Sequence, residues 1–373
     1  MQFTDNKAAE SALSERPHQR KKLPDILKGF AVILVVLGHC IQEGSGEDFS
    51  VRSLYFYDKL YQFIYSFHMP LFMAVSGYLC RESMSRAVTR PERITMLKKR
   101  AVRLLSPIFL WTGADMVRSF VTAPEPLPFE PGEFLLSFFR AALLNLWFLW
   151  AVFWCFLIVY IIHYLFHDSV LLYTAGFISM FFLPDGLGLG AYKYMLPFFV
   201  AAFYAHDFLN THNCAALREP RLWRVLSAGA VFGILFLFFD ENSMIYLSGY
   251  RITGKDVLLQ LRIDFYRALT GFAGIAFFTL LWQYILRKTE GKLKFRVLTE
   301  LGKNSLGIYI LSGYILLLFV RRIPFITEPS YLLNIAETLV ILPLTLFITK
   351  VAGNVPFLCL FVGKARKKSA ASS

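Results

Sequence analysis

The sequence predicts an all-α protein, a polytopic transmembrane helix bundle of about ten spans with the N- and C-termini in the cytoplasm. Three observations lead to this prediction. Hydrophobic residues make up 56% of the 373 residues, and the mean hydropathy is +0.50, which is too apolar for an ordinary soluble protein. Charged residues, 17% of the chain, occur in bursts between apolar stretches. The basic residues also concentrate in alternate loops, as membrane topology requires.

The predicted spans follow the apolar stretches between the charged segments. They cover approximately residues 24–42, 58–80, 104–122, 146–166, 169–184, 192–209, 223–240, 264–286, 305–323 and 331–350. The fifth and sixth are short, and the Gly-rich turn at 185–190 between them suits either a tight hairpin or a re-entrant loop. Residues 353–363 form an apolar stub that is too short to cross, which we expect at the inner interface.

The distribution of lysine and arginine orients the bundle. Under this layout, 26 of the 39 Lys and Arg residues lie in the two tails and in alternate loops, whereas the opposite loops are acidic or mixed. This is the positive-inside pattern, which places the N-terminus in the cytoplasm. We expect a multi-pass protein of the cell (inner) membrane. The same placement argues against nucleic acid as a partner, despite a net charge of +13.

We expect three parts in the chain. Residues 1–22 are predicted to be a disordered basic cytoplasmic tail, 23–363 a single transmembrane domain, and 364–373 a second basic cytoplasmic tail. No small-residue cleavage site follows the first apolar run, so the first helix is expected to stay in the membrane. The five cysteines are scattered without metal-ligand spacing, so we expect them to be packing residues and expect no bound metal.

Lys28 and His39 stand out in the first span. They are 11 residues apart, which at 100° per residue is about 20° past three full turns, so both project from one helix face about 16 Å apart. An ionisable residue inside a span costs about 2.5–3.5 kcal/mol and is therefore a functional hypothesis. Alternatively, Lys28 snorkels to the inner surface and His39 is hydrogen-bonded at the outer boundary. Their shared face favours a functional interpretation.

The second span carries His68 shortly before Pro70, which frees a backbone carbonyl, and before Gly77, which allows close helix approach. We expect His68 to donate a hydrogen bond to another helix. A second histidine of the functional site is the alternative.

Arg100 and Arg103 lie at the inner end of the third span, three residues apart and therefore on one helix face. Two guanidiniums in this arrangement form a forked anion site that suits phosphates. The alternative is ordinary positive-inside charge, and we interpret the preceding Lys98 and Lys99 in that way.

Together these features resemble the membrane acyltransferase-3 family, whose members acylate sugars and other acceptors. Each matching motif is weak alone, but the set follows the family order over approximately residues 23–350. The motifs are Asp25-x-x-Lys28-Gly29, Gly38-His39, Phe67-His68-Met69-Pro70-Leu71-Phe72 with Ser76-Gly77-Tyr78, Arg100-x-x-Arg103, Leu146-Trp147-Phe148-Leu149, and Leu301-Gly302-Lys303-Asn304-Ser305 through Tyr309.

Two positions depart from the family pattern. The family usually has arginine where this chain has Lys28, which keeps the charge but loses the bidentate fork. The family often has histidine shortly after the ninth-span tyrosine, whereas this chain continues from Tyr309 to Ser312. No role can be transferred for that histidine.

The resemblance implies an integral membrane acyltransferase that moves an acyl group, such as acetyl, from cytoplasmic acyl-CoA to a hydroxyl of a carbohydrate, a lipid-linked glycan or another surface acceptor. His39 is similar to the family's essential histidine and would act as base or acyl carrier. Lys28, Arg100 and Arg103 would bind acyl-CoA (acetyl-CoA), the donor substrate, with no permanently bound cofactor. Residues in possible supporting roles are Asp25, which we expect to pair with Lys28, and His68, Trp147, Asn304 and Tyr309.

Two other functions compete with this one. A transporter or flippase of a small or lipid-linked polar substrate would also place cations and histidines inside spans. Transporters are commonly built from internal repeats, and we find none in this sequence. A noncatalytic membrane scaffold is the third hypothesis, under which His39 would be dispensable.

Overall fold

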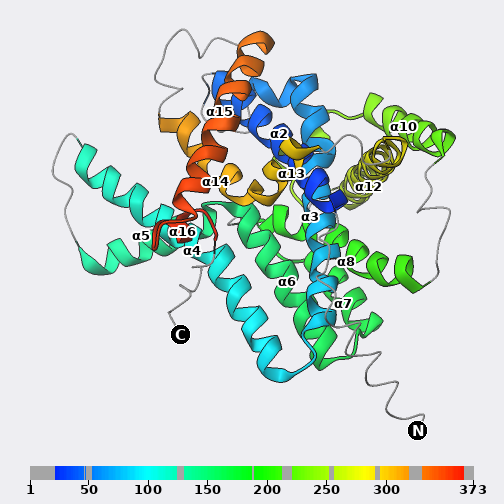
Figure 1. The fold of residues 1–373 in the computed structure, drawn as a ribbon, viewed down its shortest axis with the longest axis horizontal. Helices are drawn as coiled ribbons and strands as arrows, with labels where there is room; N and C mark the ends of the chain where they lie inside the picture. Colours follow the sequence, from blue (N-terminus) through cyan, green and yellow to red (C-terminus); the bar gives the residue numbers. More distant parts are fainter. Residues whose placement is uncertain are drawn as a thin grey trace.

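The computed structural model describes residues 22–45, 47, 53–123, 130–186, 189–211, 221–251, 256–289, 295–318 and 330–364. These residues form helices joined by turns, and the described part of the chain contains no strand (Figure 1). The helices are α2 (Lys22–Gly44), η1 (Leu54–Tyr57), α3 (Lys59–Arg86), α4 (Arg90–Thr122), α5 (Pro131–Leu144), α6 (Trp147–Leu165), α7 (Val170–Met180), α8 (Leu189–Thr211), α10 (Leu222–Leu237), η3 (Glu241–Ser243), α11 (Ile245–Ser248), α12 (Val257–Lys288), α13 (Arg296–Lys303), α14 (Ser305–Leu318), α15 (Tyr331–Ala352) and α16 (Leu358–Phe361).

Several helices have the length and composition of membrane spans, which confirms the predicted all-α polytopic bundle. Among the described residues, α2, α3, α6, α12 and α15 are each long and apolar enough to cross a bilayer. A sixth candidate consists of α13 and α14, which are bent by 78° relative to each other at Asn304. The count of about ten spans and the cytoplasmic placement of both termini stay predictions.

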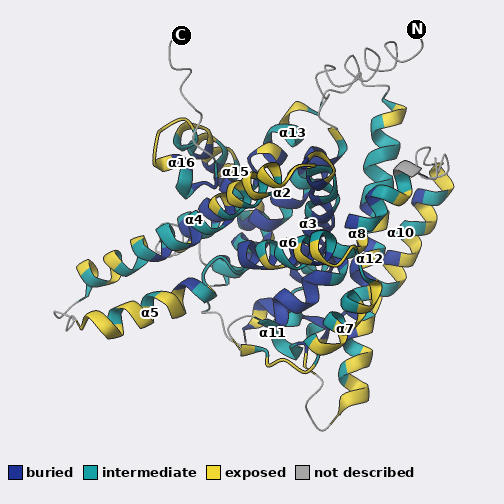
Figure 2. Ribbon diagram, turned by 90° about the horizontal axis from the view of Figure 1, so that it is seen from below, coloured by how far each residue is buried: buried dark blue, intermediate teal, exposed yellow. Residues whose placement is uncertain are grey.

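Two segments differ from the expected layout. The predicted fifth span, 169–184, contains the helix α7, whose 11 residues are about 17 Å long and cannot cross about 30 Å of hydrocarbon alone. The helix α5, with 14 residues, was not expected, because its apolar run is too short to be recognised as a span. Helices α4 and α5 run side by side as an arm that projects from the bundle (Figure 2). The predicted tails fall almost entirely outside the described residues.

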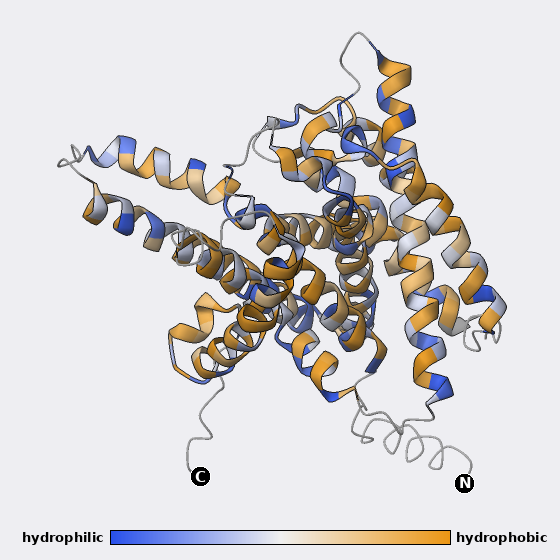
Figure 3. Cartoon of the chain, turned by 90° about the horizontal axis from the view of Figure 1, so that it is seen from above, coloured by the Kyte–Doolittle hydropathy of each residue, from blue (hydrophilic) through white to orange (hydrophobic). Residues whose placement is uncertain are grey.

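The outer helices present apolar side chains to their surroundings. Exposed hydrophobic residues include Leu226, Ile234 and Leu237 on α10, Phe265 on α12 and Leu339 on α15. Figure 3 shows that hydrophobic residues occupy much of the length of the long helices. A surface of this kind suits contact with lipid rather than water.

Helix α2 lies at the centre of the bundle, packed against α3, α12, α13, α14 and α15. Two glycines allow α13 to cross α2 closely: a Cβ atom at Gly29 would collide with the backbone of Leu298, and one at Gly302 with the backbone of Asp25. Because α13 occupies this position, the chain bends at Asn304 and α14 starts inside the bundle. The bend therefore follows from backbone contacts with α2.

Gly77 has the role predicted for it. It lies where α3 packs against α8, and a Cβ atom there would collide with the carbonyl oxygen of Phe199. The close approach of these two helices therefore requires a residue without a side chain.

We predict that Gly77→Ala lowers the melting temperature of the detergent-solubilised protein, because the added methyl group overpacks the α3–α8 contact at a cost of about 1–3 kcal/mol. Gly233→Ala on α10 is the matched control, since nothing lies within 4 Å of a Cβ at that position. There the stronger helix propensity of alanine should leave stability unchanged or slightly higher. Equal melting temperatures for the two variants would contradict the packing argument.

Candidate active site

An inner cavity of about 160 Å³ brings together three cationic side chains from distant parts of the sequence. Lys28 comes from α2, and Arg100 and Arg103 come from α4. Most of the remaining wall is apolar and includes Phe72 and Phe148. The three residues predicted to bind an anionic donor therefore surround one space.

Contacts with neighbouring side chains hold two of these cations, Lys28 and Arg100, in place. The Lys28 ammonium lies 3.0 Å from the carboxylate of Asp25, so the predicted pairing is confirmed. The Arg100 guanidinium lies over the ring of Phe156, 4.4 Å from the ring centroid, where the negative face of the ring attracts the positive charge. Both charges are thus held at the cavity wall by the protein.

The first turn of α14 also lines the inner cavity, through Ser305 and Leu306. The first N–H groups of a helix have no partner within the helix, and the helix dipole makes this end attractive to anions. The bend at Asn304 therefore adds a helix N-terminus to the three cations, as in other membrane proteins with broken helices.

An outer cavity of about 450 Å³ contains His39. Its wall is rich in aromatic rings and in side chains that form hydrogen bonds. The aromatic residues are Tyr61, Tyr65, Trp147, Tyr246, Tyr309 and Tyr314, and the polar ones include Gln42, Glu43, Asp115 and Asn145.

His39 is oriented by a serine on α14. The Nδ1 atom of His39 lies 3.3 Å from the hydroxyl of Ser312, and that hydroxyl donates its own hydrogen to the carbonyl oxygen of Tyr309 at 3.1 Å. With the Ser312 hydrogen directed at Tyr309, the contact fits the tautomer in which the Ser312 oxygen accepts from the Nδ1–H of the imidazole. This tautomer leaves Nε2 unprotonated and able to accept a proton.

Tyr309 belongs to the walls of both cavities. Its ring centroid lies 6.2 Å from that of His39 and 5.9 Å from that of Phe148, a residue of the inner cavity. Tyr309 therefore stands between the cationic cavity and the cavity that contains the histidine.

The family can be identified from the sequence as a whole. A family model described as an acyltransferase domain, that of acyltransferase family 3, matches residues 22–352, nearly the entire chain. The chain belongs to this family. The protein is thus a membrane acyltransferase that transfers groups other than aminoacyl groups. The family membership that the motifs predicted is confirmed.

Two relatives of this acyltransferase share the name nodulation protein NolL. The one from Mesorhizobium japonicum is 28% identical over 78% of this chain and 74% of its own length. The one from Sinorhizobium fredii is also 28% identical, over 78% of this chain and 76% of its own length. No solved structure matches the chain.

The residues predicted to have supporting roles lie in different places. Trp147, the first residue of α6, lies on the wall of the outer cavity, and Tyr309 lies on both walls. Asn304 lies at the bend between α13 and α14, where its side chain donates to the carbonyl oxygen of Glu300 at 2.8 Å. Asn304 thus shapes the site by ending α13.

The prediction for His68 is wrong. We expected an interhelical hydrogen bond, but Nδ1 of His68 lies 2.6 Å from the carbonyl oxygen of Ile64, one turn earlier in the same helix. An imidazole can reach back to the i−4 carbonyl when it is buried against its own helix, and this satisfies its donor without a partner helix. His68 does not line either cavity described above.

Two residues near the site could not be selected from the motifs. Ser312 departs from the family pattern, and nothing local in the sequence connects it to a histidine 273 positions away. Glu337 lies on α15, is only 9% exposed, and belongs to the helix face that packs on α2. The rule that flags ionisable residues inside spans would have found Glu337, which lies within the predicted span 331–350.

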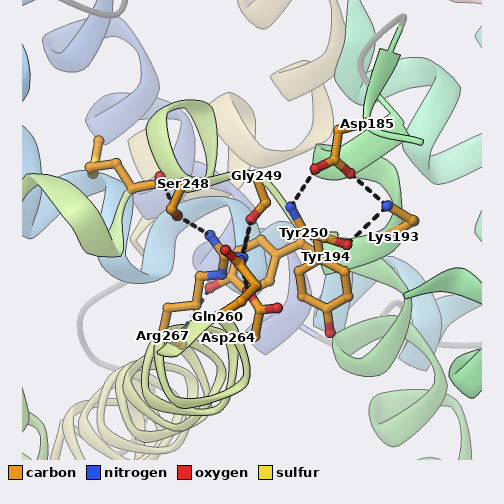
Figure 4. A network of polar contacts seen from close by, with 10 residues as sticks. Asp185, Lys193, Tyr194, Ser248, Gly249, Tyr250, Gln260, Asp264 and Arg267 are labelled. Carbon is orange, nitrogen blue, oxygen red and sulfur yellow. Dashed lines mark hydrogen bonds and ion pairs between the residues drawn. The ribbon is translucent and has the colours of Figure 1, made fainter. Parts of the chain in front are cut away.

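The same rule also selects a polar network whose residues line neither cavity (Figure 4). Lys193 on α8 pairs with Asp185 at 2.5 Å and donates to the carbonyl oxygen of Tyr250 at 2.9 Å. On α12, the buried Arg267 pairs with Asp264 and donates to the Ser248 hydroxyl at 2.9 Å. These contacts join α8, α11 and α12, so we interpret the network as structural.

We predict that Arg267→Met strongly destabilises this acyltransferase, because it leaves the carboxylate of Asp264 buried without its partner, at a cost of about 3–5 kcal/mol. The double variant Asp264→Leu with Arg267→Met should recover part of the loss. Melting temperatures in detergent measure both effects, with the exposed Arg262→Met on the same helix as control. A double variant less stable than Arg267→Met would refute the pairwise explanation.

Proposed function

We propose that this acyltransferase moves an acyl group, such as acetyl, from acyl-CoA in the cytoplasm to a hydroxyl of a glycan or lipid-linked glycan at the outer side of the cell membrane. The observation that carries the proposal is the pair of cavities that meet at Tyr309, one with the cations and one with His39. The predicted topology assigns the cationic cavity to the cytoplasm.

The inner cavity supports acyl-CoA as the donor. Coenzyme A is a polyanion that is found in the cytoplasm, and the inner cavity combines Lys28, Arg100 and Arg103 with the N-terminus of α14. The apolar side chains around these groups suit the thin acyl and pantetheine part of the donor.

The outer cavity supports a sugar as the acceptor. Its aromatic rings offer flat faces for the apolar faces of sugar rings, and side chains such as Gln42 and Asn145 offer hydrogen bonds to hydroxyl groups. His39 is the histidine among the residues that line this cavity.

The reaction needs one proton transfer and one exchange of bonds. The acceptor oxygen attacks the thioester carbonyl, a C–O bond forms, the C–S bond breaks, and the hydroxyl proton finally protonates the departing thiolate. With Nδ1–H donated to Ser312, His39 presents Nε2 either to take that proton or to carry the acyl group to the acceptor.

We predict that His39→Ala abolishes acyl transfer while the protein still inserts into the membrane and keeps its melting temperature. The assay is transfer of labelled acetyl from acetyl-CoA to membrane glycans, together with mass spectrometry of surface glycans from cells with and without the protein. His167→Ala, an exposed histidine outside both cavities, is the control and should stay active. Full transfer by His39→Ala would reject the role of this residue.

We predict that Ser312→Ala lowers kcat roughly tenfold with little change in the KM for acetyl-CoA, because the imidazole loses the hydrogen bond that sets its tautomer. Ser312→Thr keeps the hydroxyl and should restore most of the rate. Steady-state kinetics on the purified protein separate the two parameters. If Thr and Ala at this position give the same kcat, the hydroxyl does not position His39.

A further inference from the structure

A groove of about 530 Å³ lies along the turn between α3 and α4. Figure 1 shows where these two helices lie in the fold. Arg100 and Arg103 belong to the walls of both spaces, so the inner cavity and the groove adjoin at this arginine pair. The groove also contains Arg86 from the end of α3 and Lys99 from α4. By the predicted topology it lies on the cytoplasmic side.

The sizes of the two spaces decide what each can hold. The inner cavity, at about 160 Å³, is below the range of roughly 300–1,000 Å³ that is usual for sites of drug-sized ligands. It can accept a thin chain but not a nucleotide. The groove, at about 530 Å³, falls within that range.

The charge of the groove favours phosphates. Four cationic side chains line it, namely Arg86, Lys99, Arg100 and Arg103. Its carboxylate, Glu92, is engaged in a capping box at the start of α4, where it accepts a hydrogen bond from the backbone N–H of Thr89 at 2.9 Å. This bond lowers the pKa of Glu92, so the carboxylate stays ionised, and it directs the negative charge at the helix N-terminus. Four cations against this one carboxylate leave the wall of the groove with a net positive charge.

The groove also has apolar surface beside its cations. Ala87, Pro91 and Met96 line it together with the hydroxyls of Ser83 and Thr95. A flat base can pack on such side chains while phosphates contact the cations, and this is the combination that an adenosine phosphate needs.

We propose that this groove binds the nucleotide end of the donor, the 3′-phosphorylated adenosine diphosphate of acyl-CoA, while the pantetheine arm runs past Arg100 and Arg103 into the inner cavity. The proposal rests on the proposed function, in which acyl-CoA is the donor. It gives Arg86 and Lys99 a binding role and separates Lys99 from its neighbour Lys98, which does not line the groove.

The test compares two donors on the purified full-length protein: acetyl-CoA, and S-acetyl-pantetheine, which keeps the thioester and the arm but lacks the nucleotide. Arg86→Ala and Lys99→Ala should each raise the KM for acetyl-CoA roughly threefold to tenfold, because each removes a charged contact to a phosphate, and should leave kcat unchanged. The KM for S-acetyl-pantetheine should stay at the wild-type value. Both residues are exposed, so the variants should fold normally.

Lys98→Ala is the matched control, since it removes the same charge from the next position of α4. It should change neither KM. A rise for Lys98→Ala as large as that for Lys99→Ala would mean that the lysines only attract anions at long range, and equal rises for both donors would mean that the nucleotide does not bind in the groove.

A direct binding measurement keeps the two proposals apart. If the wild-type protein transfers acetyl from neither donor, the proposed function is wrong. Calorimetry with adenosine 3′,5′-bisphosphate then tests the groove alone: binding that Lys99→Ala weakens and Lys98→Ala does not supports it, and no binding by the wild type overturns it.

Discussion

A charged lysine inside a helix bundle is stable only with a partner and polar surroundings, and the Asp25–Lys28 ion pair meets this need at the centre of the structure. Helix α13 crosses α2 at this level, because Gly29 and Gly302 let the backbones touch. That crossing forces the bend at Asn304, and the bend turns the start of α14 toward the inner cavity. The composition of the inner cavity therefore depends on how α13 and α14 pack against α2.

The local parts of the site could be predicted from the sequence, because helix geometry alone determines them. The spacing of Asp25 from Lys28, and of Arg100 from Arg103, is three residues in each case, so each pair shares a helix face. The spans at 24–42, 58–80 and 146–166 could also be predicted, because a sufficiently long apolar stretch is enough to indicate a membrane span.

Contacts between distant segments could not be predicted in this way. The bond between His39 and Ser312 depends on how α14 is placed against α2, and the placement depends on a bend that no periodicity records. The intrahelical bond of His68 was missed for a related reason: a histidine in a span can turn to another helix or to its own backbone, and only packing decides which.

The position of Tyr309 between the two cavities bears on hydrolysis of the acyl donor by water. Under the proposed function, the donor thioester lies in the inner cavity, and this side chain separates it from the outer cavity, whose volume of about 450 Å³ has room for many water molecules. Water is a competing nucleophile for every activated acyl group. A barrier that yields only when an acceptor fills the outer cavity would suppress futile hydrolysis of the donor and thus separate a transferase from a thioesterase.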